Sequence, residues 1–221
     1  MARGQRFSQR TRRPRRGQAV QRRVLIVSQG EITEPCYIEA LKRHWRRGAV
    51  DVREHPKNPI ALIEWADKET KRNARSGDKY DETWVVFDAE RCPNPTVLAQ
   101  AEAKARAASI QVAMSNPCFE VWLLLHLRYT HAPMVDANAA IAQLQASMPH
   151  YAKDRRGAER CMAELIEKVD TAVANAVQLR LFHQDSQAQD IPNPTTNVDL
   201  LVEVIRPPPQ RASSFQETHH D

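Results

Sequence analysis

The sequence predicts an α/β protein in which a mostly parallel sheet of about four strands is flanked by helices. Short β-branched apolar runs alternate with longer stretches of helical spacing, and the dipeptide Asn-Pro begins three of those stretches. This alternation is typical of parallel strands, because each connection must cross back over the sheet. The strands are expected at residues 23–28, 49–53, 83–88 and 110–114.

The first predicted helix follows the strand at 23–28. Thr33 and Pro35 are typical of a helix start, and Gly48 is typical of a helix end. Apolar side chains recur between them at helical spacing, which indicates a face turned to a core: Tyr37, Ile38, Leu41 and Trp45.

Asn-Pro predicts the starts of three further helices, because an Asn side chain can cap free N–H groups and Pro suits the first turn. Asn58 should begin a helix that runs to Ser76-Gly77. Asn94 should begin an Ala-rich helix that ends at about residue 108. Asn116 is expected to cap a third helix, CFEVWLLLHL.

The pattern becomes helical from about residue 134 to residue 206. Helices are expected at 136–147, 157–184 and 195–205, and this half is interpreted as helical packing, not as a second site. The folded domain should therefore span residues 23–206. A disordered polar tail is expected at 207–221.

Basic charge is concentrated at the amino terminus. Residues 1–23 contain nine Arg and no Asp or Glu, whereas the remainder carries 23 Lys and Arg against 27 Asp and Glu, a net charge of −4. Residues 1–22 are expected to form a disordered arm that binds nucleic acid through phosphates, and a solubilising tail is an equally good interpretation. The arginines predicted to bind nucleic acid are Arg10, Arg12, Arg13, Arg15, Arg16, Arg22 and Arg23.

Several classes of protein are disfavoured. No apolar run of about 18 residues is present, so we expect a cytoplasmic protein without a membrane partner. The four Cys are widely separated and are expected to be reduced thiols. Neither a Walker A loop nor a G-x-G-x-x-G turn follows a strand, which argues against nucleotide binding by those routes.

Polar residues follow three of the four predicted strands, where a parallel sheet gathers its working residues. Asp88 and Glu90 follow the third strand as an Asp-x-Glu pair, which an extended chain would place on the same side. Two such carboxylates suit Mg²⁺ or Mn²⁺. Most Asp-x-Glu pairs are merely solvated, and Glu34 and Asn116 also fit ordinary helix starts.

Several stretches together resemble the RloB-like family. They occur in order and at sensible spacing over about residues 22–205. The matching stretches are VLIVSQGEITEPCYIEAL, YDETWVVFDAE, AMSNPCFEVWLLLHL, the Tyr151-Ala152-Lys153 triplet and NPTTNVDLLVE. The resemblance implies a relative of the Toprim fold, a metal-dependent nuclease in bacterial defence against phage, and an RloA-like ATPase partner.

The resemblance also implies roles for individual residues. Asp88 and Glu90 would hold Mg²⁺ or Mn²⁺, with Glu34 as a further ligand or as acid and base. Lys153 would contact a phosphate, although a solvated loop lysine is nearly as good an interpretation. The supporting residues would be Asn116 as a helix cap, Glu120 near the metal, and Tyr151.

One position departs from the family pattern. The family turn resembles C-E-G-E-x-T-E, whereas this chain reads S-Q-G-E-I-T-E, so Gln29 stands where a catalytic Glu is expected. An amide cannot accept a proton at neutral pH. Glu31 could take over the role, the protein could be a natural variant that binds without cutting, or the sequence could be an engineered inactive form.

Two other functions stay open from the sequence. A non-catalytic nucleic-acid-binding or regulatory subunit of a defence complex would explain Gln29. A small-molecule phosphotransfer or nucleotide-binding enzyme would fit the sheet, but it would not need an Arg-rich arm. The sequence distinguishes neither RNA from DNA nor a monomer from a homo-oligomer.

Overall fold

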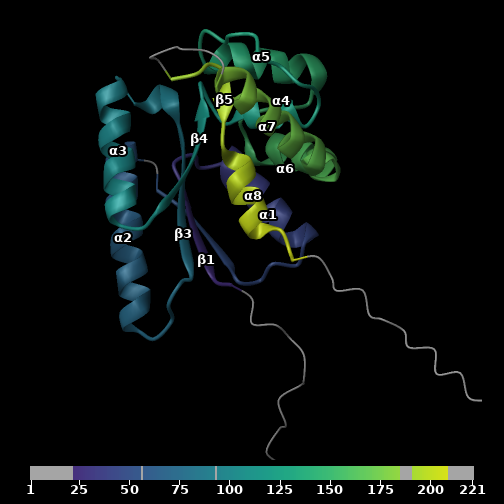
Figure 1. Ribbon diagram of the computed structural model, residues 1–221. Coiled ribbons are helices and arrows are strands. Elements are labelled where there is room, and N and C mark those ends of the chain that lie inside the picture. Colours follow the sequence, from purple (N-terminus) through teal and green to yellow (C-terminus); the bar gives the residue numbers. More distant parts are fainter. Residues whose placement is uncertain (1–21, 56, 93, 185–190, 209–221) are drawn as a thin grey trace, which may run out of the picture.

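The computed structural model describes residues 22–55, 57–92, 94–184 and 191–208 (Figure 1). Its centre is a five-stranded sheet in the order β2-β1-β3-β4-β5. The four predicted strands are confirmed and are parallel, and a fifth strand pairs antiparallel with β4. The strands are β1 (Val24–Ser28), β2 (Val50–Glu54), β3 (Glu82–Asp88), β4 (Gln111–Asn116) and β5 (Thr195–Thr196).

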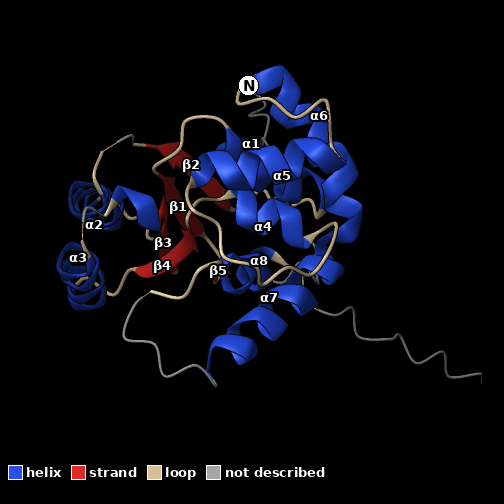
Figure 2. Ribbon diagram, turned by 90° about the horizontal axis from the view of Figure 1, so that it is seen from above, coloured by secondary structure: helices blue, strands red, loops and turns tan. Residues whose placement is uncertain are grey.

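Helices cover both faces of the sheet (Figure 2). Helices α2 and α3 pack together on one face, and the other helices lie on the opposite side, where α1 contacts β2 and α8 contacts β4. The helices are α1 (Thr33–His44), α2 (Pro59–Arg75), α3 (Pro95–Ala107), α4 (Glu120–Leu125), α5 (Ala137–Ser147), α6 (Arg155–Leu165), α7 (Val169–Gln184) and α8 (Val198–Ile205).

Strand β1 is apolar throughout because its side chains enter two cores. Val24 and Ile26 belong to the larger core beneath α1 and α4, whereas Leu25 and Val27 belong to the core beneath α2 and α3. All four are fully buried. Successive side chains of a strand point to opposite faces, so a strand covered on both faces needs an unbroken apolar run.

The most apolar helix, α4, lies inside the larger core. All six of its residues are buried, from Glu120 to Leu125. Its neighbours are α5 and α7, which lie on the same side of the sheet. None of the helices in the described part of the chain is both long enough and apolar enough to cross a membrane.

Two of the three Asn-Pro helix starts are confirmed. The Asn58 side chain accepts a hydrogen bond from the Ala61 N–H at 3.0 Å, at the start of α2. The Asn94 side chain accepts one from the Val97 N–H at 3.0 Å, at the start of α3. In both helices, Pro occupies the first turn, where its missing N–H costs nothing.

The prediction that Asn116 caps a helix is wrong. Asn116 is the last residue of β4, and its register partner is Thr195 of β5. Helix α4 begins only at Glu120 and has no side-chain cap. Strand β4 continues past its predicted end and pairs with β5. The Asn116 Nδ2 group donates to the Pro192 carbonyl at 2.8 Å, in the segment that leads to β5.

Two predictions in the helical half also need correction. The helix expected at 157–184 is interrupted by a 3₁₀ turn at Ile166–Lys168, which separates α6 from α7. The helix expected at 195–205 begins only at Val198. Thr196 belongs to β5, where its hydroxyl lies 2.8 Å from the Ser115 hydroxyl, and this cross-strand contact favours the extended conformation.

Candidate functional site

The carboxyl ends of three neighbouring strands bring several predicted site residues together. β1 leads into the turn that carries Gln29 and Glu34, β3 ends at Asp88, and α4 begins at Glu120 shortly after β4. The Gln29 N–H donates to the Val86 carbonyl at 2.8 Å, which holds this turn beside β3. Since parallel strands end at one edge, the order β1-β3-β4 accounts for the convergence.

Glu34 is a buried carboxyl group in the first turn of α1. Its residue is only 5% exposed, although the position would ordinarily face solvent at a helix start. Burial, together with the negative charge of Glu120, raises the pKa of Glu34 to about 7 against the opposing effects of backbone hydrogen bonds and Lys153. Gly30 makes room for this group, because a Cβ at Gly30 would overlap the Glu34 carboxylate.

Asp88 lies beside Glu34 at the end of β3 and is partly buried. Burial raises its pKa well above the usual range, and the charges of Glu34, Glu120 and Glu90 raise that pKa further. Asp88 and Glu34 therefore hold protons more tightly than exposed carboxyl groups do. Any positive charge placed between them would relieve this repulsion.

Glu120 receives two donors from the helical half of the chain. The Tyr151 hydroxyl donates to Glu120 Oε1 at 2.6 Å, and the Lys153 ammonium lies 3.0 Å from the same oxygen. Glu120 is 1% exposed, and Tyr151 is buried with its hydroxyl 3.3 Å from that of Thr33. Burial lowers the pKa of Lys153, but the attraction of Glu120 outweighs it and the pKa is raised. The helical half of the chain thus supplies the two side chains that contact Glu120.

The expected pairing of Asp88 with Glu90 on an extended stretch is wrong. The chain turns into a 3₁₀ helix at Ala89–Arg91, so the alternation of a strand stops at Asp88. Glu90 is exposed, and its carboxylate accepts a hydrogen bond from the Ala137 N–H at 3.3 Å, at the start of α5. Its role as a metal ligand stays a prediction, and its observed contact is with the helical half.

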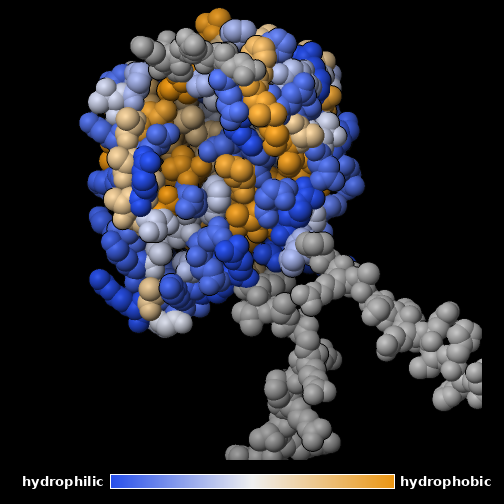
Figure 3. All heavy atoms as spheres, in the orientation of Figure 1, coloured by the Kyte–Doolittle hydropathy of each residue, from blue (hydrophilic) through white to orange (hydrophobic). Residues whose placement is uncertain are grey.

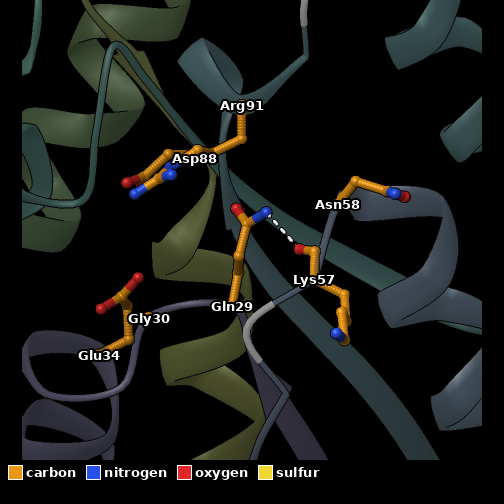
Figure 4. A pocket seen from close by; sticks show the side chains of 7 residues that line it. All are labelled: Gln29, Gly30, Glu34, Lys57, Asn58, Asp88 and Arg91. Carbon is orange, nitrogen blue, oxygen red and sulfur yellow. Dashed lines mark hydrogen bonds between the residues drawn. The ribbon is translucent and has the colours of Figure 1, made fainter.

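Gln29 is held by a hydrogen bond that requires an amide. Its Nε2 group donates to the Lys57 carbonyl at 2.6 Å (Figure 4). Its Oε1 atom is buried and has no hydrogen-bond partner among the described residues. Glu31, the suggested substitute, is exposed and lines a different cavity from Gln29.

Two adjoining cavities open at this edge of the sheet. The larger, about 410 Å³, is called here the Gln29 cavity, and the smaller, about 190 Å³, the Lys153 cavity. Both are lined by Gly30, Glu34, Asp88 and Arg91. The Gln29 cavity adds Gln29, Lys57 and Asn58, and the Lys153 cavity adds Glu31, Ile32, Thr33, Phe119, Glu120 and Lys153.

The residues of this cleft that were missed from the sequence include three polar ones that line the Gln29 cavity: Lys57, Asn58 and Arg91. Lys57 and Asn58 follow β2, the one predicted strand after which the sequence predicted no site residue. Because β2 lies next to β1, its end borders the same cleft. Arg91 follows the Asp-x-Glu pair directly and could have been found by extending that motif by one residue.

The cleft matches a divalent cation in the chemistry of its donors. Glu34, Asp88 and Glu120 offer hard carboxylate oxygens, and their mutual repulsion would be reduced by a cation. Within the described residues, however, no group of three His, Cys, Asp or Glu side chains is arranged to hold a metal ion. Binding would require these carboxyl groups to move closer together.

Most of the predicted nucleic-acid-binding arginines lie outside the described residues; these are Arg10, Arg12, Arg13, Arg15 and Arg16. Arg22 and Arg23 are described, at the amino end of β1. Arg22 pairs with Glu82 at 2.7 Å, and Arg23 contacts Asp78 and stacks on the Tyr80 ring. These contacts lie a strand length from the cleft, about 16 Å for five residues.

The fold and the cleft define an α/β protein with an acidic site at the carboxyl edge of a mostly parallel sheet. The family of RloB-like proteins matches residues 24–205, most of the chain. The chain therefore belongs to the RloB-like family, as its motifs predicted. Comparisons with curated proteins and with solved structures found no match.

Proposed function

We propose that the protein is a divalent-metal-dependent nuclease that hydrolyses phosphodiester bonds of RNA or DNA. The observation that carries this proposal is the convergence of Glu34, Asp88 and Glu120 in a cleft that is also lined by Arg91 and Lys153. Carboxylates suit the cation, and the basic side chains suit the phosphates of the substrate.

Each side chain of the cleft has a distinct part in this proposal. Asp88, Glu34 and Glu120 would hold Mg²⁺ or Mn²⁺, which would neutralise charge developing on the phosphate. Lys153 keeps its positive charge beside Glu120, so it can bind a phosphate oxygen while Tyr151 holds Glu120 in place. Without the cation Glu34 has a pKa of about 7, and it would release its proton when the cation binds.

The setting of this activity is proposed from family membership. The RloB-like family is associated with bacterial antiphage defence, so the enzyme would act in the bacterial cytoplasm with an RloA-like ATPase as partner. The same sheet-edge site would make it a member of the Toprim-related nucleases. A phage plaque assay with and without the ATPase gene would test this setting, and equal plaque counts for native and Asp88→Asn proteins would contradict it.

A second candidate is a non-catalytic nucleic-acid-binding subunit, and Gln29 is the observation that favours it. The amide at position 29 is integrated into the structure through the Lys57 carbonyl, so it does not resemble a vacant catalytic position. Such a protein would retain the cleft and bind nucleic acid without cutting it. The cleavage experiment separates the two candidates.

The experiment measures cleavage of tRNA, single-stranded RNA and DNA, and duplex DNA with Mg²⁺ or Mn²⁺. Native protein, Asp88→Asn and Gln29→Glu are compared, with Glu102→Gln as control because Glu102 is exposed on α3. Cleavage by native protein and the control that disappears with Asp88→Asn supports the proposal. Cleavage that appears only with Gln29→Glu identifies an inactivated nuclease, and binding without cleavage in every variant favours the second candidate.

A further inference from the structure

A basic cavity lies at the carboxyl end of α1, far from the cleft. Its volume is about 310 Å³, and it is called here the Arg47 cavity. Four basic residues, one acid and a glycine line it: Lys42, Arg43, Arg46, Arg47, Glu39 and Gly48. The acid, Glu39, is paired with Lys42 at 2.7 Å, so the three arginines have no acidic partner of their own in this cavity. Since the 12 residues of α1 span about 18 Å, the cavity is separate from the cleft at the start of the helix.

These basic side chains are not needed to end the helix. The Arg46 N–H donates to the Arg43 carbonyl at 3.3 Å, and the Arg47 N–H donates to the Lys42 carbonyl at 2.9 Å. These are the two hydrogen bonds of a Schellman motif, so backbone groups already satisfy the carbonyls. The helix dipole amounts to about half a negative charge at this end, whereas the cavity has four basic side chains against one acid. Most of the positive charge is therefore left for a ligand.

Two of the arginines occupy positions that are costly for the protein alone. Arg47 is 6% exposed, and its guanidinium makes no hydrogen bond or ion pair with any described residue. A buried charge without a partner is destabilising, and an anion in the cavity would compensate it through space without reaching the buried Nε atom. Arg46 has a φ of 53°, so this chain has an arginine where the motif ordinarily has glycine.

We propose that the Arg47 cavity binds a phosphate group at a site separate from the cleft. Guanidinium groups donate paired hydrogen bonds to phosphate, and the exposed Arg43 and Arg46 supply them beside the charge of Arg47. A small phosphorylated molecule and a nucleic-acid backbone share this chemistry. The Val24 N–H donates to the Ala49 carbonyl at 3.0 Å, so the turn after α1 lies beside the first residue of β1. This inference does not depend on the proposed nuclease.

The test is a chemical-shift titration of the full isotope-labelled chain, at constant ionic strength and without divalent cations. The probes are inorganic phosphate and a short single strand of DNA. The Gly48 N–H reports on this site, because Gly48 lines the Arg47 cavity and neither cavity of the cleft. We expect saturable shifts there, and Arg47→Gln and Arg46→Gly should each weaken binding at least about tenfold, the loss of one charge-assisted hydrogen bond. Arg106→Gln, exposed on α3, should leave binding unchanged.

Arg46→Gly keeps the test decisive if Arg47→Gln is unstable. Glycine suits the positive φ, so the urea midpoint should stay the same or rise while phosphate binding falls. Shifts at Gly48 that do not saturate with either probe would overturn the inference, as would affinities in Arg46→Gly equal to those of the native protein. Saturation supports the site: with DNA it identifies a nucleic-acid backbone as the source of the phosphate, and with phosphate alone it identifies a small phosphorylated molecule. Failure of the cleavage panel would leave this site standing.

Discussion

At the scale of single residues, the cleft depends on close contacts that a small change disrupts. Gln29 is bonded through its amide to the loop after β2, and Glu34 is buried against Gly30. The Gln29 contact is not visible in the spacing of the sequence, because the sheet brings in its partner from the loop after β2, whereas Gly30 and Glu34 lie four residues apart in one turn. Three predictions test these contacts.

Gln29→Glu should destabilise the fold when no divalent cation is added. The substitution removes the donor to the Lys57 carbonyl and places a carboxylate oxygen against it. We expect the free energy of unfolding to fall by about 1 kcal/mol, the typical net value of one hydrogen bond. Urea denaturation in EDTA measures this, with Gln111→Glu as the exposed control. A Gln29→Glu protein as stable as the native one would show that the amide is not required there.

Gly30→Ala should impair the site without unfolding the chain. The new methyl group would overlap the Glu34 carboxylate, which is the movable end of a side chain and can be displaced. Gly48→Ala is the matched control, since a Cβ at Gly48 meets no atom within 4 Å. We expect affinity for Mn²⁺, followed by calorimetry, to fall at least about tenfold in Gly30→Ala alone, the cost of a misplaced ligand group. Equal affinity in both variants would exclude Glu34 from the cation site.

Stability without a cation should decrease between pH 5 and pH 8. The pKa of Glu34 is raised from its ordinary value of 4.5 to about 7, so the folded state binds its proton more tightly than the unfolded chain. This contribution is present below about pH 4.5 and is lost as the pH rises through about 7. Its size is on the order of 3 kcal/mol, from a shift of about two units or more.

Glu34→Gln should therefore flatten the pH dependence and raise stability most at pH 8. Urea midpoints at pH 5 and pH 8 in EDTA provide the measurement, with Glu102→Gln as control. Asp88, whose pKa is also raised, should leave a residual slope of the same sign. A slope unaltered by Glu34→Gln would contradict the buried, proton-binding state of Glu34.

At the scale of elements, α7, β5 and α8 are joined by an ion pair between the partly exposed Arg180 and the buried Asp199. The Arg180 guanidinium binds the Asp199 carboxylate through two hydrogen bonds of 2.5 and 2.7 Å, and it also donates to the Thr196 carbonyl at 3.1 Å. Asp199 is 2% exposed. This contact holds α8 against the edge of the sheet where β5 pairs with β4.

Asp199→Ala should lower the free energy of unfolding by about 2 kcal/mol, because it removes two hydrogen bonds between charged groups at a buried carboxylate. Asp170→Ala is the control, since Asp170 pairs with Arg206 but its side chain is 87% exposed; it should cost less than about 1 kcal/mol. Chemical denaturation of both variants measures the difference. Similar losses in the two variants would show that the pair is screened by solvent.

At the scale of the whole molecule, charge and apolar surface are separated. The acidic cleft lies at the carboxyl edge of the sheet, and in the sequence the Arg-rich residues 1–21 come before β1. Apolar side chains are exposed on the helical side, and Figure 3 shows apolar surface along α8. These exposed side chains are Val135 before α5, Val177, Leu181 and Phe182 on α7, and Leu200 on α8.

Deleting residues 1–21 should weaken binding to RNA and DNA and reduce its salt dependence. This segment contains seven Arg, and each phosphate contact that is lost lowers the slope of log K against log salt by about 0.7 to 0.9. Fluorescence anisotropy between about 50 and 200 mM salt measures both effects. Affinity that is unchanged by the deletion would assign the segment a solubilising role instead.

Local signals in the sequence were reliable for the first half of the chain. The four parallel strands and the helix starts at Asn58 and Asn94 depend on nearby residues, so periodicity and capping preferences predicted them. The prediction of a helix cap at Asn116 was wrong because the dipeptide Asn-Pro can also end a strand when a partner strand is available. Its partner, β5, lies about 80 residues further along the chain and carries no local signal.

The sequence by itself determined the parallel α/β fold, the family, and the acids at the ends of β1, β3 and β4. Only the tertiary structure decided that Glu120 is paired with Tyr151 and Lys153, that Glu90 contacts α5, and that the loop after β2 holds Gln29. The physical reason is the distance along the sequence over which each interaction acts. Periodicity and caps act within a few residues, whereas burial, charge pairing and cavity shape depend on segments that meet only when the sheet has formed.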